Sequence, residues 1–510
     1  MNRPIRNLAV ACLVLFLALI ANASYLQFFE ADSLTSLSEH PRNVRVADAA
    51  FSAPRGDILV NGQAIASSQP SDDRYEYQRV YKSGPEYSHI VGYFNRGLIG
   101  GLESSQNDYL TGEAPELFVN RLGDLLTNKP PAGGNVVLTL NAKAQKAAYR
   151  ALKDLGKNVR AAAVAIQPST GKILAMVPNP GFDPSSLATH DFAKARAAYD
   201  RLNPEKPSSP LNNPAIEDRV PPGSTFKLVT AAAALSSGDY QPSTLVDGSR
   251  VLDFRDTTSD LGNHNGQACG PNNKVTLIRA LEISCNVAFA SIGTKLGQDA
   301  LRQQAEKFGF NDPDPYFTDL DDQQTRQQAS VFPNDIAAVS SLGYSSIGQF
   351  SVAATPLQMA MVAAGIANDG KVMKPYLVNE IRSSDLDVVK SFDKQLYSQA
   401  VTPSVADQLT DMMVSVVDNG TGSNAQISGV KVAGKTGTAQ TGVDGQKPYA
   451  WFVSFAPADN PEVAVAVVVF DTAAAARRGC GADVDCEGGI SGNEMAAPVA
   501  RSVMEAVLNK

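Results

Sequence analysis

An uncharged apolar run near the N-terminus constrains this chain more than any other sequence feature. Residues Leu8 to Ala21 carry no charge and follow Arg3 and Arg6. With the apolar residues up to Phe29, the run reaches about 20 residues, enough for a helix to cross a bilayer. Basic residues before such a helix favour a cytoplasmic N-terminus. We therefore expect residues 1–30 to form a single-pass membrane anchor and the rest to be extracytoplasmic.

Cleavage of this segment is an alternative. The motif Ala21-Asn22-Ala23 resembles a signal-peptidase site, and cleavage there would release a soluble protein. The apolar stretch continues past the motif through Tyr25 and Phe28, which favours retention in the membrane. Both interpretations predict an exported protein.

Export affects how the cysteines are interpreted. Four of the five cysteines form two close pairs, Cys269 with Cys285 and Cys480 with Cys486. In an oxidising compartment these pairs predict two disulfides, with four free thiols as the alternative. Neither pair has CxxC spacing and the four histidines are scattered, so we expect no metal site. The formal net charge of -8 argues against nucleic-acid binding.

The 510 residues are enough for two or three domains. The Pro/Gly-rich segment 128–134 is the best boundary candidate. We divide the chain into the anchor, a small β-rich module over 31–157, and a larger domain over 158–510.

The larger domain has predicted strands near both ends and predicted helices between them. This order predicts an α+β domain with one mostly antiparallel sheet covered by helices. The predicted strands span 161–167, 172–177, 430–439, 449–455 and 463–470, and the predicted helices span 224–235, 276–296, 355–367 and a final segment from 494. A strand at 135–140 and a helix at 142–155 precede them.

A candidate nucleophile lies in the segment 221–227, Pro-Pro-Gly-Ser-Thr-Phe-Lys. We expect Ser224 to begin a helix whose free N–H groups favour a developing negative charge. Lys227 then lies one turn later on the same face. A lysine acts as a base only when neutral, which requires burial or a second cation to lower its pKa. Considered alone, the motif more often marks a helix-capping serine and an exposed lysine.

Two further motifs carry polar side chains suited to the same chemistry. Ser284 is a candidate proton relay and Asn286 a candidate ligand of lysine and substrate, although a polar pair at a helix end is the alternative. Lys435 is the candidate second cation, expected to lower the pKa of Lys227 and to attract a carboxylate. Thr436 and Thr438 offer hydroxyls to that carboxylate, and Gly437 lets a ligand approach the strand. A strand that ends in a glycine turn is the alternative for this motif.

The order Ser-x-x-Lys, Ser-x-Asn, Lys-Thr-Gly resembles that of penicillin-binding proteins and class A β-lactamases. The chain is most similar to monofunctional class B-type transpeptidases of the short, penicillin-binding protein A-like form. Further matching segments are Pro54-Arg55-Gly56-Asp57, Gly101-Leu102-Glu103, Phe182-Asp183-Pro184, Thr355-Pro356-Leu357-Gln358 and Ala367-Asn368-Asp369-Gly370.

The resemblance implies the penicillin-binding transpeptidase fold, which has an all-helical lobe beside its sheet and here follows a pedestal or dimerisation-like module. It implies that Ser224 attacks a stem peptide ending in D-Ala-D-Ala, or a β-lactam, with Lys227 as base and Ser284 as proton shuttle. Asn286, Lys435, Thr436, Gly437 and Thr438 would bind substrate, and the backbone N–H groups of Ser224 and Thr438 would form the oxyanion hole.

The family also implies no cofactor, and a separate membrane glycan polymerase with division or elongation proteins as partners. One departure is Gly348-Gln349-Phe350, where the family often has Gly-Gln-Gly. The alternative functions are a β-lactamase, a D,D-carboxypeptidase, and a non-enzymatic penicillin sensor or division scaffold.

Overall fold

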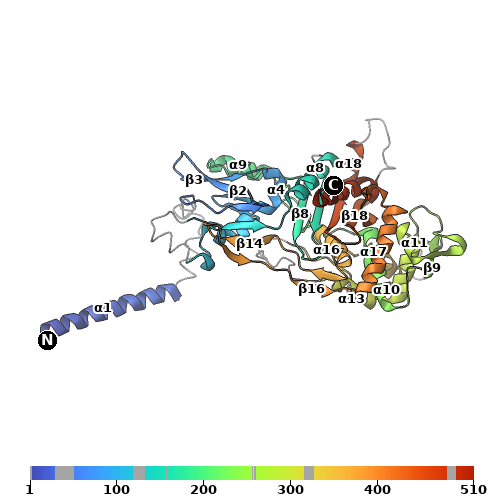
Figure 1. Ribbon diagram of the computed structural model, residues 1–510, viewed down its shortest axis with the longest axis horizontal. Helices are drawn as coiled ribbons and strands as arrows, with labels where there is room; N and C mark the ends of the chain where they lie inside the picture. The colour runs from blue at the N-terminus through green and yellow to red at the C-terminus, as the bar shows by residue number, and fades with distance from the viewer. Residues whose placement is uncertain are drawn as a thin grey trace.

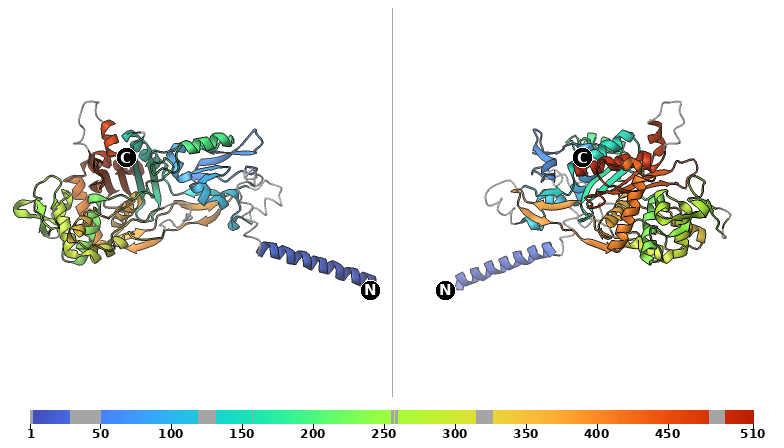
Figure 2. Two further views of the ribbon diagram at one scale, coloured as in Figure 1. Left: turned by 180° about the vertical axis from the view of Figure 1, so that it is seen from behind. Right: turned by 45° about the vertical axis from the view of Figure 1, so that its right-hand side comes forward.

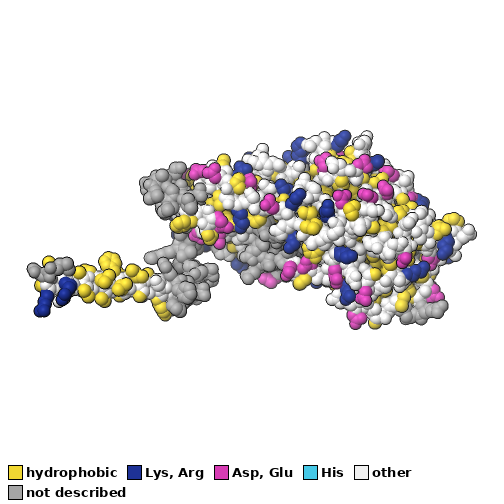
Figure 3. All heavy atoms as spheres, turned by 60° about the horizontal axis from the view of Figure 1, so that its bottom comes forward, with side chains coloured by type: hydrophobic (Ala, Val, Ile, Leu, Met, Phe, Trp, Pro, Cys, Tyr) yellow, Lys and Arg dark blue, Asp and Glu magenta, His cyan; other side chains and the backbone are white. Residues whose placement is uncertain are grey.

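The computed structural model describes residues 3–28, 51–118, 132–156, 158–254, 257, 260–314, 327–478 and 490–510. Helix α1 (Arg3–Phe28) projects from a globular body (Figure 1). Its segment Arg3–Leu26 has a mean hydropathy of 2.3 and is long and apolar enough to cross a membrane. Figure 3 shows apolar side chains around this helix and basic side chains at its free end. The predicted apolar helix is therefore confirmed and is compatible with a single-pass anchor.

A six-stranded sheet forms the part of the body that lies nearest α1 in Figure 1. Its strands, in spatial order, are β15 (Val388–Ser391), β14 (Val378–Arg382), β6 (Asn135–Leu138), β1 (Ile58–Val60), β2 (Gln63–Pro70) and β3 (Tyr77–Tyr81). The described part of the N-terminal module contributes β1, β2, β3 and β6 to this sheet, so the predicted β-rich character is confirmed. However, β14 and β15 come from residues 378–391, so the sheet contains strands from both sides of the predicted boundary.

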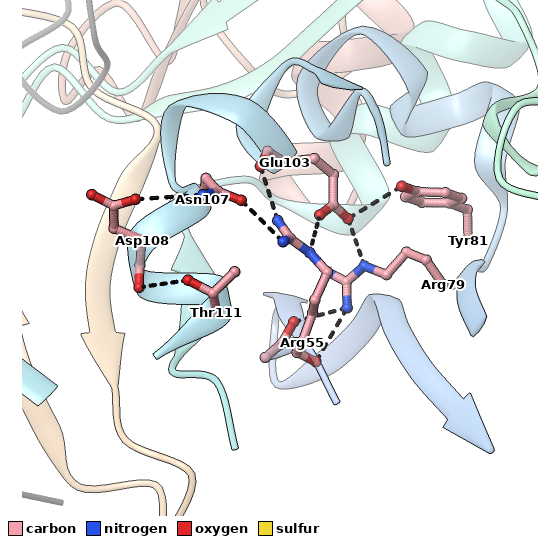
Figure 4. A network of polar contacts seen from close by, with 8 residues as sticks. Arg55, Arg79, Tyr81, Glu103, Asn107, Asp108 and Thr111 are labelled. Carbon is pink, nitrogen blue, oxygen red and sulfur yellow. Dashed lines mark hydrogen bonds and ion pairs between the residues drawn. The ribbon is translucent and has the colours of Figure 1, made fainter. Parts of the chain in front are cut away.

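The six-stranded sheet is accompanied by short elements and by a buried ionic network. The short elements are α4 (Gly84–Val91), β4 (Tyr93–Asn95), β5 (Leu98–Gly100), α5 (Leu102–Ser105), α6 (Asn107–Thr111), η1 (Pro115–Leu117), η2 (Pro184–Ser186) and α9 (Phe192–Arg201). Glu103 receives hydrogen bonds from Arg55 Nε at 3.1 Å and Arg79 Nε at 2.5 Å, and all three side chains are buried (Figure 4). Burial would raise the pKa of Glu103, but the two guanidinium groups hold it below its usual value.

A five-stranded antiparallel sheet forms the centre of the larger domain. Its order is β17 (Ala433–Ala439), β18 (Tyr449–Ala456), β19 (Val463–Val469), β7 (Ala161–Ile166) and β8 (Ile173–Asn179). Every residue of β7 and β19 is buried, as expected for Ala/Val runs covered on both faces. Helices α8 (Ala142–Leu155) and α20 (Ala497–Leu508) pack on one face, and α16 (Pro356–Ala367) packs against the same sheet within the main core. The predicted antiparallel sheet covered by helices is confirmed.

A mainly helical lobe lies at the end of the molecule opposite α1, as both views in Figure 2 show. It contains α10 (Lys227–Ser237), α11 (Leu277–Glu282), α12 (Asn286–Leu296), α13 (Gln298–Lys307), α15 (Val339–Ser345) and α17 (Pro403–Asp418). The small strands β9 (Leu245–Asp247), β10 (Val251–Leu252), β11 (Leu261–Gly262) and β12 (Lys274–Thr276), and the turn η4 (Pro271–Asn273), extend the lobe. The predicted all-helical lobe is therefore correct for the main elements but not for the small strands. The remaining elements are β13 (Lys371–Met373), β16 (Leu396–Gln399), η5 (Ser423–Ala425), α18 (Thr472–Arg478) and α19 (Gly492–Met495).

Two predicted helices differ from the structure at the positions that matter for function. The helix predicted from Ser224 begins at Lys227, and Ser224 lies in the preceding 3-10 turn η3 (Gly223–Phe226). The helix predicted over 276–296 is broken into α11 and α12. Ser284 ends α11 in a left-handed conformation, with φ of 60°. The N–H of Cys285 donates to Ala280 O at 2.8 Å, a helix-ending pattern that usually has glycine at the left-handed position.

Candidate active site

The turn that carries Ser224 lies directly against strand β17. Gly223 has φ of 52°, and a Cβ atom there would lie 2.8 Å from the Cβ of Ala439. Its N–H donates to Gly348 O at 2.9 Å. Glycine is needed here because both the conformation and the close approach exclude a side chain. Ser224 itself is partly exposed, next to Thr438 in the same cavity.

Trp451 on β18 connects this turn to the sheet. Its indole Nε1–H donates to Pro221 O at 3.0 Å, and the side chain is completely buried. Trp451 pairs in register with Gly437 on β17. A Cβ on Gly437 would lie 3.0 Å from the carbonyl oxygen of Pro222 and from Thr225 Cγ2, so the turn packs over this glycine. Trp451 was missed in the sequence, although the only tryptophan in 510 residues was an available signal.

Lys227 is completely buried and directs its ammonium group to the break between α11 and α12. Its Nζ donates to Ser284 O at 2.7 Å, Ser284 Oγ at 3.2 Å and Asn286 Oδ1 at 2.7 Å. The left-handed conformation of Ser284 presents its carbonyl and hydroxyl oxygens to the same lysine. The structure therefore brings the first two predicted motifs into direct contact.

Lys435 approaches the same hydroxyl from β17. Its Nζ donates to Ser284 Oγ at 3.0 Å and to the carbonyl of Thr436 at 2.9 Å. The Ser284 hydroxyl oxygen therefore lies between two lysine nitrogens, and the side chains of Lys227 and Lys435 are both fully buried. A hydroxyl between two amines is placed to pass a proton from one to the other.

Burial makes the neutral form of both amines accessible. Burial lowers the pKa of Lys227 well below its usual value, and the neighbouring charge of Lys435 lowers it further. Burial lowers the pKa of Lys435 to about 7. The expected lowering of the Lys227 pKa by Lys435 is therefore present, and removal from water is the larger of the two effects.

The Ser284–Asn286 segment is held by a loop that lies across from β17. The predicted disulfide between Cys269 and Cys285 is present, with Cα atoms 6.0 Å apart. Asn263 Oδ1 accepts from the N–H groups of Asn286 at 3.0 Å and Val287 at 3.1 Å, which caps α12. Asn263 had no sequence signal, because its partners are far along the chain. The other predicted pair, Cys480 and Cys486, lies outside the described residues.

The hydroxyls of the third motif line the cavity in front of β17. Thr436 Oγ1 lies 2.7 Å from Thr421 Oγ1, a contact that sequence reasoning missed. Thr438 is partly exposed on the same strand. The lining of this cavity also includes Gly492, where a Cβ would lie 2.0 Å from Trp451 O, so only glycine permits this approach to the sheet.

Ser224 lies between two cavities. One, of about 480 Å³, contains Ser284, Thr421, Thr436 and Ser491 in its lining. The other, of about 450 Å³, lies on the side of Tyr344, Gln349 and Gln440. The two share five lining residues: Ser224, Asn263, His264, Asn286 and Thr438. A group attached to Ser224 can therefore be approached from two sides.

In Gly348-Gln349-Phe350, where the family often has Gly-Gln-Gly, Phe350 adopts a left-handed backbone conformation. Phe350 has φ of 61° and is 55% exposed. Gly348 has φ of 72°, and a Cβ there would lie 2.2 Å from Gly223 O. The segment thus supports the Ser224 turn through Gly348, while Phe350 adopts a conformation that glycine favours. In the described part of the chain, no group of three or more His, Cys, Asp or Glu side chains has metal-binding geometry.

A helix-covered antiparallel sheet, with a helical lobe that holds a serine turn against its edge strand, defines the class of penicillin-recognising serine acyl-transferases. Within that class, the chain belongs to the penicillin-binding protein transpeptidase family, because the Penicillin binding protein transpeptidase domain matches residues 161–504. The Penicillin binding protein A dimerisation domain matches residues 55–136.

Relatives align along the whole chain. The peptidoglycan D,D-transpeptidase PbpA of Mycolicibacterium smegmatis is 41% identical over 514 residues, covering 100% of both chains. PbpA of Mycobacterium tuberculosis is 38% identical, covering 100% of this chain and 99% of the relative. The ceftriaxone acyl-enzyme of M. tuberculosis penicillin-binding protein A superposes with a TM-score of 0.82 at 38% identity, covering 90% of this chain and 100% of the other. The penicillin G acyl-enzyme has a TM-score of 0.80 at 37% identity with the same coverage.

Proposed function

We propose that the protein is a peptidoglycan D,D-transpeptidase that forms its acyl-enzyme on Ser224. The observation that carries this proposal is the position of the Ser284 hydroxyl between two buried lysines, beside a serine that opens onto two cavities. The PbpA relatives and the acyl-enzyme structures of M. tuberculosis penicillin-binding protein A support it.

The first half-reaction joins Ser224 to the donor stem peptide. Neutral Lys227 accepts the proton of Ser224 as its Oγ attacks the carbonyl carbon between the two D-alanines. The backbone N–H groups of Ser224 and Thr438 stabilise the oxyanion. The bond to the terminal D-alanine breaks, and the proton passes through Ser284 to the departing amine. A β-lactam undergoes the same attack, with its ring amide as the bond that breaks.

The second half-reaction uses the other approach to Ser224. The side-chain amine of a second stem peptide attacks the acyl carbon, forms the new amide, and releases Ser224, which regains its proton. Lys435, Thr436, Gly437 and Thr438 bind the donor carboxylate and backbone before this step, and Asn286 orients the donor amide. Lys435 is suited to carboxylate binding because its pKa of about 7 leaves it partly charged at neutral pH.

Intact-mass spectrometry after incubation with penicillin tests the acylation step. We expect one adduct on Ser224, and none in Ser224→Ala. Rapid loss of the adduct with hydrolysed penicillin in solution would identify a β-lactamase. With a pentapeptide donor and an amine acceptor, crosslinked product supports a transpeptidase, whereas free tetrapeptide alone identifies a D,D-carboxypeptidase. Normal crosslinking in cells that carry only Ser224→Ala would favour a scaffold.

We also propose that α1 anchors the enzyme with its N-terminus in the cytoplasm and residues 31–510 outside. Arg3 and Arg6 precede the apolar segment and support this orientation. A membrane glycan polymerase, with division or elongation proteins, is the partner class expected for an enzyme that crosslinks nascent strands. The orientation is tested by fusing to residue 510 a reporter that is active only outside the cytoplasm. An inactive fusion would indicate the opposite orientation.

A further inference from the structure

Three segments of the candidate active site meet at Trp451. Its indole N–H donates to Pro221 O, three residues before Ser224. Its backbone pairs with Gly437, the residue before Thr438. Its carbonyl oxygen would lie 2.0 Å from a Cβ atom placed on Gly492, so the backbones of the two residues are in close contact. One fully buried residue therefore contacts the nucleophile turn, the edge strand and the wall of the cavity.

The other hydrogen bonds of the turn do not tie it to the sheet through a side chain. Val220 and Ala354 pair through their backbones, and Gly223 N–H donates to Gly348 O. Thr225 Oγ1 donates to Pro222 O at 2.7 Å within the turn itself. Among these hydrogen bonds, the one from the Trp451 indole is the one in which a side chain joins the turn to β18, the strand paired with β17.

We infer that Trp451 is a positioning residue that sets the distance between the two oxyanion-hole donors. This inference rests on the proposed function. The N–H of Ser224 belongs to the turn, and the N–H of Thr438 belongs to β17. An oxyanion is stabilised only when both donors point at the same place, so a shift of the turn against the strand weakens the hole without removing either donor. A displacement of about 1 Å is enough to slow a reaction by about two orders of magnitude.

The single tryptophan allows an atomic test. Biosynthetic replacement of tryptophan by 3-benzothienylalanine changes only residue 451, because the chain has one tryptophan. The analogue keeps the bicyclic shape but has sulfur in place of the N–H. Replacement by 5-fluorotryptophan, which keeps the N–H, controls for the incorporation procedure. Both proteins are titrated for penicillin-reactive sites, so that only folded molecules are compared.

We expect the benzothienyl protein to show a limiting acylation rate constant at least about tenfold lower with penicillin G. The dissociation constant of the preceding non-covalent complex should change less than about threefold, because the carboxylate contacts are unaltered. Affinity for a boronic acid, whose tetrahedral adduct occupies the oxyanion hole, should fall by a similar factor to the rate constant. The 5-fluorotryptophan protein should behave like the natural one.

Two substitutions distinguish the effect of losing the indole hydrogen bond from that of a general loss of packing. Trp451→Phe removes the N–H, and Phe455→Leu removes buried aromatic volume from the same strand, opposite Ala433 rather than Gly437. The inference is overturned if acylation is unchanged without the indole N–H, or if Phe455→Leu lowers the rate constant and boronate affinity equally. If the natural protein forms no penicillin adduct at all, the proposed function fails first and this inference falls with it.

Discussion

Lys227 and Lys435 are two buried amines in one site, and the charge of Lys435 affects the protonation of Lys227. In the proposed mechanism Lys227 acts only when neutral, so acylation should slow as the pH falls through its pKa. Lys435→Ala removes the nearby charge and raises the pKa of Lys227, while burial continues to lower it. We expect the acid limb of the acylation profile to move to higher pH, so that the rate at pH values on that limb is lower than in the natural protein.

Stopped-flow acylation across pH measures this shift. Lys431→Ala is the matched control, because Lys431 is an exposed lysine near β17 that pairs with Asp459. Its profile should match that of the natural protein. If Lys435→Ala weakens binding of a carboxylate ligand but leaves the profile in place, Lys435 has no influence on the base.

Phe350 carries backbone strain that a single substitution should relieve. Its φ of 61° is unfavourable for any side chain, and its ring is more than half exposed. We expect Phe350→Gly to stabilise the protein by about 0.5–1 kcal/mol in urea unfolding, because strain is lost with little buried area. Val339→Gly, at an exposed position in α15, should instead destabilise it. Equal losses from both variants would show that Phe350 is held by packing.

At the scale of elements, the disulfide between Cys269 and Cys285 joins a loop of the helical lobe to helix α12. It links two residues 16 positions apart in the sequence and closes the intervening loop onto the start of α12. The loop-entropy estimate assigns such a link about 3 kcal/mol. Urea unfolding with and without reductant should show a loss of this order, absent in a protein carrying Cys269→Ser and Cys285→Ser. Alkylation of both thiols without reduction would contradict the bond.

Most elements of the five-stranded sheet and of the helices that cover it follow from local patterns. The helix over 142–155 has an asparagine cap at Asn141 and the observed bounds of α8. The strands over 161–167 and 463–470 are runs of small apolar residues, and such runs are buried in sheets. The order of the three motifs also indicated which residues converge, because a family resemblance carries information about distant contacts.

The missed features depend on contacts between distant segments. Residues 276–296 have a continuous helical pattern, yet Ser284 leaves it in a left-handed conformation beside Lys227 and Lys435. Thr421 reaches the site because α17 ends beside β17, which no local pattern indicates. Strand β14 likewise joins a sheet formed mostly by residues more than 200 positions earlier.

At the scale of the whole molecule, the network around Glu103 should stabilise the six-stranded sheet. Glu103→Ala would leave the buried guanidinium groups of Arg55 and Arg79 facing each other, at a loss of about 3–5 kcal/mol. Glu116→Ala removes a half-exposed partner of Lys390 and of the Tyr109 hydroxyl, and should lose at most about 1 kcal/mol. Thermal unfolding compares the two, and equal losses would remove any special role for the buried network.

The position of Trp451 also has a practical result. One indole accounts for all tryptophan emission of the chain, and it contacts the turn that carries Ser224. Tryptophan emission, excited at wavelengths that tyrosine does not absorb, therefore reports from a single place near Ser224. Adding penicillin should alter the intensity or wavelength of this emission at the rate of adduct formation. The emission of the Ser224→Ala protein should not change. The enzyme would then report its own inhibition without a dye.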